Sequence, residues 1–188
     1  MSKIVLSLSG VSLLVLAACQ TTGNKEYWSD WESIPHHEAM LEWEPSKPTE
    51  LFARKLSYNG AYQEHWEWKN GSLFVETAGH AYHFREETSP QKFGTFMEGW
   101  NAFKESGKKI SASDVRTVRN KYGKFYYADV KNDANQECWT FLQSIPEKTV
   151  AGFIETGKPS GYLSGYECGA NRPSENEIMD FSKSFSFS

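Results

Sequence analysis

A pair of alternating runs joined by Asn70-Gly71 constrains the fold of this chain more than any other feature. Residues 61–78, AYQEHWEWKNGSLFVETA, alternate apolar and polar side chains on both sides of that pair. Such alternation is typical of half-buried strands, and Asn-Gly suits a tight type I′ turn because both residues tolerate positive φ. The sequence therefore predicts a β-hairpin, and with it an antiparallel sheet.

The length of the loop sets the register of this hairpin. With Asn70 and Gly71 as a two-residue loop, His65 pairs with Glu76 across the strands. One face then collects the side chains that we expect in the core, which are Trp66, Trp68, Leu73 and Val75. The other face collects those that we expect in water, which are His65, Glu67, Lys69, Ser72 and Glu76, with Phe74 as its one large apolar residue.

Further strands are expected on both sides of the chain's midpoint. A second turn at Ala78-Gly79 leads into HAYHFR, so residues 61–85 are predicted to form a three-stranded meander. Three more strands are expected between turn-rich segments, near 124–130, 136–143 and 161–168.

Two segments have the period of an amphipathic helix. Near 90–105, apolar side chains recur at spacings of three and four after a Ser89-Pro90 start. Near 174–185, Ser174 is followed three residues later by Glu177, which is the pattern of a capping box.

Two other segments fit more than one structure. Residues 111–120 suit either a helix or a strand, and residues 33–43 suit a short helix with Pro35 in its first turn. The elements together predict the α+β class, an antiparallel sheet with helices packed against one face, in a single domain spanning 35–188.

The amino terminus has the layout of an export signal. Lys3 gives a positive start, and an apolar run of about 15 residues extends from Ile4 to small residues before Cys19. That run is shorter than the roughly 20 residues that a helix needs to cross a bilayer. A permanent membrane span is therefore not expected.

The residues LAAC, Leu16 to Cys19, resemble the lipobox of bacterial lipoproteins. The resemblance implies that residues 1–18 are a cleaved signal peptide and that Cys19 carries a diacylglycerol, usually with an added N-acyl chain. Several acyl chains anchor a protein stably, because each buried methylene contributes about 0.8 kcal/mol. The alternative is an ordinary secretory signal with a cysteine beside it by chance.

The residues after the lipobox predict a location. Gln20 resembles the residue found in lipoproteins that are sorted to the outer membrane, and residues 19–34 are then a lipidated tether. We expect Trp28 and Trp31 to dock on the protein's own core; the alternative is the membrane interface, where an indole keeps one wet edge. The prediction is an outer-membrane lipoprotein on either the periplasmic or the surface face.

Two of the three cysteines remain once Cys19 is assigned to lipid. An even number in an exported chain predicts a disulfide between Cys138 and Cys168, closing a loop for which chain entropy gives about 3.5 kcal/mol. Metal binding lacks a Cys-x-x-Cys spacing, and a Cys-His catalytic pair lacks a local signature. The order CWTFLQ, GYLSGYECG and a terminal helix is similar to small cysteine-paired bacterial envelope proteins of undefined role, which implies no functional residue.

Charge and histidine spacing exclude several classes of ligand. The net charge is −4 without a basic stripe, so nucleic acid is not an expected partner. His80 and His83 lie three apart, which places them on opposite faces of a strand. A cross-strand pair of His65 with Glu76 is commonly a surface interaction. We therefore predict no metal site and no cofactor.

Catalysis has no positive support in the sequence. Two carboxylates that face one cleft suit glycoside hydrolysis, and the candidates are Glu64, Glu67, Glu76, Glu86 and Glu87. A solvated face is the more common use of such charges. The chain carries no G-x-S-x-G or H-E-x-x-H motif and no phosphate-binding glycine loop.

The aromatic content suggests a binding role instead. Aromatic side chains that would suit stacking on the sugar rings of a glycan are Trp28, Trp31, Trp43, Trp66 and Trp68. The predicted function is a non-enzymatic, membrane-anchored module that binds another envelope component, a protein first and a glycan second. The alternatives are a hydrolase acting on envelope polymers and an inhibitor of a foreign enzyme.

Overall fold

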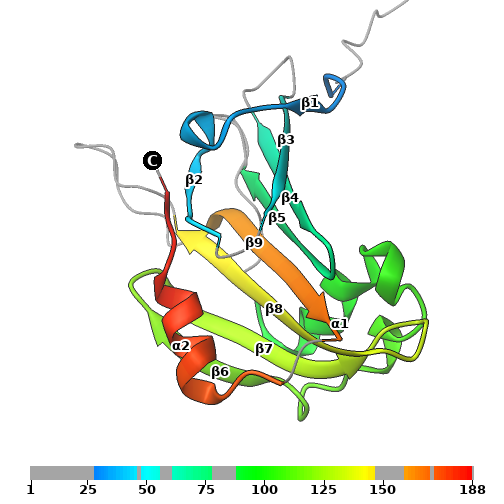
Figure 1. The fold of residues 1–188 in the computed structure, drawn as a ribbon. Coiled ribbons are helices and arrows are strands. Elements are labelled where there is room, and N and C mark those ends of the chain that lie inside the picture. The colour runs from blue at the N-terminus through cyan, green and yellow to red at the C-terminus, as the bar shows by residue number, and fades with distance from the viewer. Residues whose placement is uncertain are drawn as a thin grey trace, which may run out of the picture.

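A computed structural model of the chain describes residues 28–45, 48–55, 61–77, 88–146, 159–169 and 172–187. Within these residues, eight strands form one antiparallel sheet (Figure 1). Its spatial order is β1 (Glu32–Ser33), β3 (Glu50–Lys55), β4 (Tyr62–Trp68), β5 (Gly71–Thr77), β9 (Pro159–Cys168), β8 (Glu137–Pro146), β7 (Gly123–Lys131) and β6 (Arg116–Asn120). The α+β class is thus confirmed, with the sheet as the dominant part.

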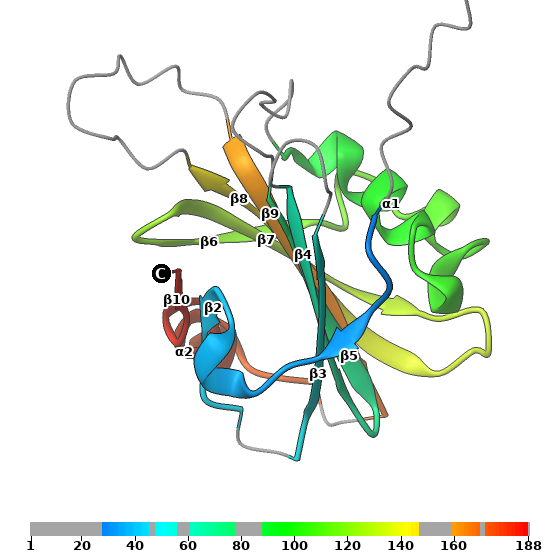
Figure 2. The same ribbon diagram turned by 90° about the horizontal axis from the view of Figure 1, so that it is seen from above.

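The remaining elements are short. A two-stranded sheet joins β2 (Leu41–Glu42) to β10 (Ser186–Phe187). The helices are α1 (Pro90–Glu98), α2 (Glu175–Lys183) and the 3₁₀ turns η1 (His36–Glu38), η2 (Asn101–Phe103) and η3 (Gly107–Lys109). Figure 2 shows α1 and α2 on opposite sides of the strands, so the prediction that the helices pack against one face is wrong. No helix among the described residues is long and apolar enough to span a membrane.

The sheet carries a hydrophobic cluster on each face. Successive side chains of a strand point to opposite faces, and β7 is apolar at both sets of positions. Phe125 and Tyr127 belong to the cluster on the α2 side, whereas Tyr126 and Ala128 belong to the cluster on the α1 side. The other members on the α1 side include Phe93, Met97, Phe103 and Leu142, and those on the α2 side include Trp66, Phe141, Ile178 and Phe185.

The hairpin is confirmed, but its predicted register is wrong. The loop consists of Lys69 and Asn70, so Trp68 pairs with Gly71 and His65 pairs with Phe74 rather than Glu76. Each residue's partner thus lies two positions from the one expected. Because side chains alternate with a period of two, this shift leaves every side chain on its predicted face.

Gly71 is required for a different reason than the one predicted. Positive φ occurs at Asn135, Gly123 and Gly169 among the described residues, so the Lys69-Asn70 turn is not of type I′. A Cβ at Gly71 would lie 2.5 Å from the Tyr166 carbonyl oxygen and 2.6 Å from the Trp68 indole. The glycine therefore makes room for a ring and a neighbouring strand.

The two faces of the hairpin are more alike than predicted. Trp66, Leu73 and Val75 are fully buried, which confirms the core face. The face predicted to be wet is exposed at Glu67 and Lys69 but covered at Ser72, which is only 3% exposed. Phe74 contacts Trp31 and Trp100 there, with ring centroids 6.3 Å apart in both pairs. Aromatic side chains from outside the hairpin supply this cover.

The helices differ from their predicted bounds. The helix predicted near 90–105 ends at Glu98, and the chain continues in 3₁₀ turns. A Cβ at Gly94 would lie 2.7 Å from the Gly107 carbonyl oxygen, so the following turns fold back against α1. Ser89 makes no side-chain cap bond, although Pro90 occupies the first turn as predicted.

At the other helix the predicted capping box is present. The Ser174 hydroxyl accepts from the Glu177 backbone N–H at 3.3 Å, and the Glu177 carboxylate accepts from the Ser174 N–H at 2.7 Å. The two undecided segments are also settled. Residues 111–120 contribute β6, and residues 33–43 contribute η1 and β2 instead of an α-helix.

The disulfide predicted between Cys138 and Cys168 is present, with an S–S distance of 1.97 Å. The two residues are direct partners in the register of β8 and β9, so the bond joins adjacent strands of the sheet. The third strand predicted for the meander, in residues 78–85, lies outside the described residues.

The end of the predicted tether is bonded to the sheet. Ser29 donates its backbone N–H to the Lys55 carbonyl at 2.9 Å, and β1 pairs with β3. The Arg54 guanidinium lies 4.9 Å from the Trp28 ring and 4.5 Å from the Trp31 ring. Both tryptophans therefore contact the protein itself, but Trp31 is 38% exposed and neither residue belongs to a core cluster, so the expected docking on the core is wrong. Residues 1–27, with the signal peptide and Cys19, lie outside the described residues.

Candidate functional site

An aromatic pocket lies on the α2 side of the sheet, and we call it the Trp43 pocket. Its volume is about 360 Å³, at the lower end of the range for ligand sites. Its lining residues are Trp43, Glu44, Pro45, Thr49, Trp68, Trp139, Glu167, Asp180, Phe181 and Ser184. Five parts of the chain that are distant in sequence thus build one site.

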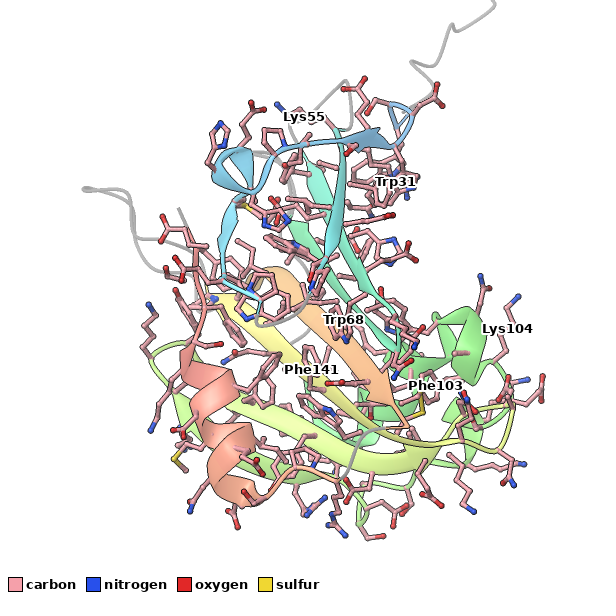
Figure 3. The ribbon with its side chains drawn as sticks, viewed as in Figure 1. Trp31, Lys55, Trp68, Phe103, Lys104 and Phe141 are labelled. Atoms are coloured by element: carbon pink, nitrogen blue, oxygen red, sulfur yellow. A yellow bond between two sulfur atoms is a disulfide. The ribbon has the colours of Figure 1, made fainter. Side chains whose placement is uncertain are left out.

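One row of residues across the sheet supplies the floor of the pocket. Trp68 pairs with Gly71, Gly71 with Glu167, and Glu167 with Trp139, so all four positions share a face. The bare Gly71 position lets the Trp68 indole lie across it. Figure 3 labels Trp68 and, well away from it, Trp31 of the opposite face.

The wall opposite the floor depends on a buried carboxylate. Glu64 is fully buried and accepts hydrogen bonds from the backbone N–H groups of Met40 and Leu41 and from the Trp66 indole N–H. These bonds hold the segment of β2 on the sheet, and β2 leads directly into Trp43. Burial raises the pKa of Glu64, since the loss of hydration outweighs these donors and the Tyr62 hydroxyl, which lower it.

Aromatic contacts fix the position of Trp43. Its ring centroid lies 5.7 Å from that of Trp68 and 5.5 Å from that of Trp66, both edge to face. The Phe181 ring of α2 meets Trp43 at 6.0 Å and Trp139 at 5.1 Å, again edge to face. Such pairs are more favourable than area burial alone predicts, so these rings form a defined wall.

The pocket combines these rings with acidic groups. Glu44 and Asp180 are exposed at its rim, and Glu167 is half-buried on its floor. The lining residues include no Lys, Arg or His among those that the structure describes. Among the described residues, the Trp68 indole N–H has no hydrogen-bond partner, so packing holds that ring in place.

Rings bordered by carboxylates favour particular ligands. Aromatic faces attract cations and the apolar faces of sugars, and carboxylates accept hydrogen bonds from ammonium, guanidinium or hydroxyl groups. The site is therefore suited to binding, with no group in it that the structure poises as a nucleophile.

Among the described histidines, His65 has the contacts that most resemble those of a catalytic residue. Its Nε2 lies 2.5 Å from the Ser72 hydroxyl and 3.6 Å from a Glu67 oxygen. In a hydrolytic triad the carboxylate and the hydroxyl contact different ring nitrogens, and here both contact Nε2. Ser72 donates its own proton to the Trp66 carbonyl at 3.1 Å. Nε2 therefore serves as a donor to Ser72, which is a structural role.

Burial has consequences for this histidine. Loss of hydration lowers the pKa of His65, while the Glu67 carboxylate acts in the opposite direction. The neutral ring is the form that packs between Trp31, Phe74 and Trp100. His65 is thus part of an aromatic cluster rather than a general base.

The predicted carboxylates do not converge. Glu64 lies on the α2 side of the sheet, whereas Glu67 and Glu76 lie on the other side. Glu76 pairs with Gln63, which lies four positions from Glu67 on β4, so these two carboxylates are about 14 Å apart along the strand at 3.4 Å per residue. That separation exceeds the carboxylate spacing of glycosidases. His80, His83, Glu86 and Glu87 lie outside the described residues.

The five predicted sugar-stacking tryptophans divide among three places. Trp28 and Trp31 stack on Arg54, Trp66 is fully buried, and Trp43 and Trp68 line the pocket. The sequence did not indicate the roles of Trp139 and Phe181. The alternation of β8 and the apolar stripe of α2 were the available signals for them, and both patterns equally describe an ordinary core.

A wider hollow lies beyond η3 and beside the turn after β7. Its acidic groups are already engaged: Asp129 pairs with Arg116 and with Arg172, the latter at 2.6 Å. Asp133 accepts from the backbone N–H groups of Glu105 and Ser106, which lowers the pKa of Asp133. In the part of the chain described here, no group of three or more His, Cys, Asp or Glu is placed to hold a metal ion.

No protein-family model, curated protein or solved structure matches this chain.

Proposed function

We propose that this protein is a lipid-anchored binding module of the bacterial envelope and that the Trp43 pocket is its binding site. The observation that carries the proposal is a concave site walled by Trp43, Trp68, Trp139 and Phe181 and rimmed by carboxylates. Tryptophan and other aromatic side chains dominate binding energy at interfaces, so such a wall suits recognition. The expected ligand is another envelope component, a protein first and a glycan second, and not nucleic acid.

The rival function is hydrolysis of envelope polymers. The groups most suited to it are used structurally: Ser72 and His65 bond to each other inside an aromatic cluster, and Glu64 binds backbone donors. Hydrolysis would need two converging carboxylates or a nucleophile beside a base in an open site. The binding proposal requires neither.

The cellular location is part of the proposal. The resemblance of Leu16 to Cys19 to a lipobox supports lipidation of Cys19, with residues 1–18 removed, and Gln20 supports sorting to the outer membrane. The disulfide between Cys138 and Cys168 agrees with an oxidising compartment. Whether the domain faces the periplasm or the exterior is independent of the binding proposal.

Site-directed crosslinking in cells tests the binding role. A photoreactive phenylalanine analogue replaces exposed Ser184 at the pocket rim, and a control carries it at exposed Ser113, before β6. We expect a discrete adduct, identified by mass spectrometry, from position 184 and none from 113. No adduct from 184, together with turnover of purified cell-wall material by the protein, would contradict the proposal.

The proposed lipidation of Cys19 has its own test. Cys19→Ser is expected to abolish incorporation of labelled fatty acid and to release the protein from the membrane fraction, because the thiol is the proposed attachment point. Persistent labelling of the variant would refute the lipobox interpretation.

A further inference from the structure

We propose that the Trp43 pocket recognises a cationic side chain, a lysine or arginine presented by a segment of a partner protein. This inference rests on the proposed binding function and names the chemistry of its ligand. It follows from the charge, the ring geometry and the size of the pocket.

The charged groups at the rim of the pocket are carboxylates. Glu44 and Asp180 approach it from two different elements, the segment after β2 and the last turn of α2. Both side chains are exposed, so a ligand reaches them without displacing the fold. The Glu44 and Asp180 carboxylates at the rim favour an incoming positive charge over an anion.

The ring geometry suits the same ligand. A cation over the face of an indole is attracted by the ring quadrupole, and tryptophan gives the strongest attraction of the aromatic residues. Trp43 and Trp68 meet edge to face at 5.7 Å, and both indoles line the pocket. The protein uses the same interaction internally, where Arg54 lies 4.5 Å from Trp31.

Size limits the ligand to a small group. About 360 Å³ accommodates one long side chain with part of its backbone, and no large ligand. A neutral sugar gains from the rings alone, whereas a lysine or arginine gains from the rings and the rim carboxylates together. The apolar stem of either side chain also packs on the indoles. The observations therefore favour a basic side chain over a glycan.

The test measures binding of short peptides to the full-length chain purified in detergent. The probes share one sequence with a central lysine, Nε-acetyl-lysine or norleucine, which differ in the charge at the end of a similar stem. We expect binding of the lysine peptide by isothermal titration and about tenfold weaker binding of the two neutral peptides. Affinity for the lysine peptide should also fall as salt rises from about 50 mM to about 500 mM.

Variants locate the effect on the protein. Glu44→Gln with Asp180→Asn removes the rim charges and should weaken lysine-peptide binding about fivefold without changing the unfolding midpoint, since both side chains are exposed. Asp30→Asn with Glu175→Gln removes two exposed charges elsewhere and should leave affinity unchanged. Equal weakening by both double variants would overturn the assignment of the charge effect to the pocket.

The outcomes separate this inference from the proposed function. Binding of an N-acetylglucosamine trisaccharide at the pocket, with no preference for lysine over norleucine, would overturn the cation inference and retain the binding module. Failure of every peptide and of the trisaccharide, in a protein that also gives no crosslink through position 184, would overturn both.

Discussion

Gly71 lies beneath the indole of Trp68, and Gly71→Ala tests whether that contact explains the glycine. The added Cβ would lie 2.6 Å from two atoms of the indole and 2.5 Å from the Tyr166 carbonyl oxygen of the neighbouring strand. Cβ atoms essentially never approach heavy atoms below 3.0 Å, so something must move. The indole, which has no hydrogen bond to its Nε1 in the described part of the chain, is the part able to shift.

The magnitude follows from overpacking. Inserting a methyl group into a packed site typically costs 1–3 kcal/mol, and we expect a loss of about 2 kcal/mol in the free energy of unfolding. The Trp68→Ala variant removes the indole and leaves the contact with the Tyr166 carbonyl oxygen. Gly71→Ala should therefore cost about 1 kcal/mol less in that background, which is a measurable coupling between contacting residues.

Urea unfolding of the four proteins in this cycle, followed by circular dichroism, measures the coupling. A positive φ at Gly71, as in the type I′ turn predicted from the sequence, would make the cost independent of Trp68. Equal costs of Gly71→Ala in both backgrounds would thus refute packing as the reason for the glycine. Ser72→Ala is a poor control because Ser72 is buried and bonded, so exposed Lys69→Ala serves instead, with an expected change below about 0.5 kcal/mol.

Three further predictions follow from named contacts. Glu64→Gln should lower the unfolding free energy by about 2 kcal/mol in urea titrations, since the amide group replaces a carboxylate oxygen and leaves a backbone N–H unpaired. As a control, Glu67→Gln at an exposed position of the same strand should change the unfolding free energy by less than about 0.5 kcal/mol. Equal losses in the two variants would contradict the role of Glu64. Replacing Cys138 and Cys168 by serine together should cost about 3.5 kcal/mol by the same assay, and an unchanged midpoint would contradict a stabilising disulfide. Burial raises the pKa of Glu76, so its carboxylate is destabilising at neutral pH, and that penalty disappears as pH falls through the folded pKa toward the unfolded value of about 4.3. The stability of wild type relative to Glu76→Gln should therefore rise as pH falls from about 7 toward about 4.3, and a fall would reverse the assigned direction.

Local patterns in the sequence predicted local structure well. The core face of the hairpin, the capping box at Ser174 and the cysteine pair each depend on residues that are close in sequence or on compartment chemistry. The predicted register was wrong because Gly71 was assigned to the turn for its ability to adopt positive φ. In the structure Gly71 belongs to β5, where its lack of a side chain makes room for the Trp68 indole. A period-two pattern sorts faces without fixing which residues pair.

Contacts between distant segments were beyond sequence reasoning. The helix predicted near 90–105 is shorter because Gly94 and Gly107 let the chain fold back, and their closeness has no local signature. The Trp43 pocket joins β4, β8, β9, α2 and the segment after β2, so no single run of residues contains it. Trp139 and Phe181 therefore looked like core residues until the topology placed them beside Trp43.

The indole N–H signals of ¹⁵N-labelled protein test the central claim most directly, because the seven tryptophans report on different parts of the fold. Each signal is assigned with a Trp→Phe variant, and the full-length chain is then titrated with the lysine peptide. We predict shifts of the Trp43, Trp68 and Trp139 signals, which line the pocket, and none for Trp31 and Trp100 on the opposite face. Shifts confined to the Trp31 and Trp100 signals, or none at any peptide concentration, would contradict the Trp43 pocket as the binding site.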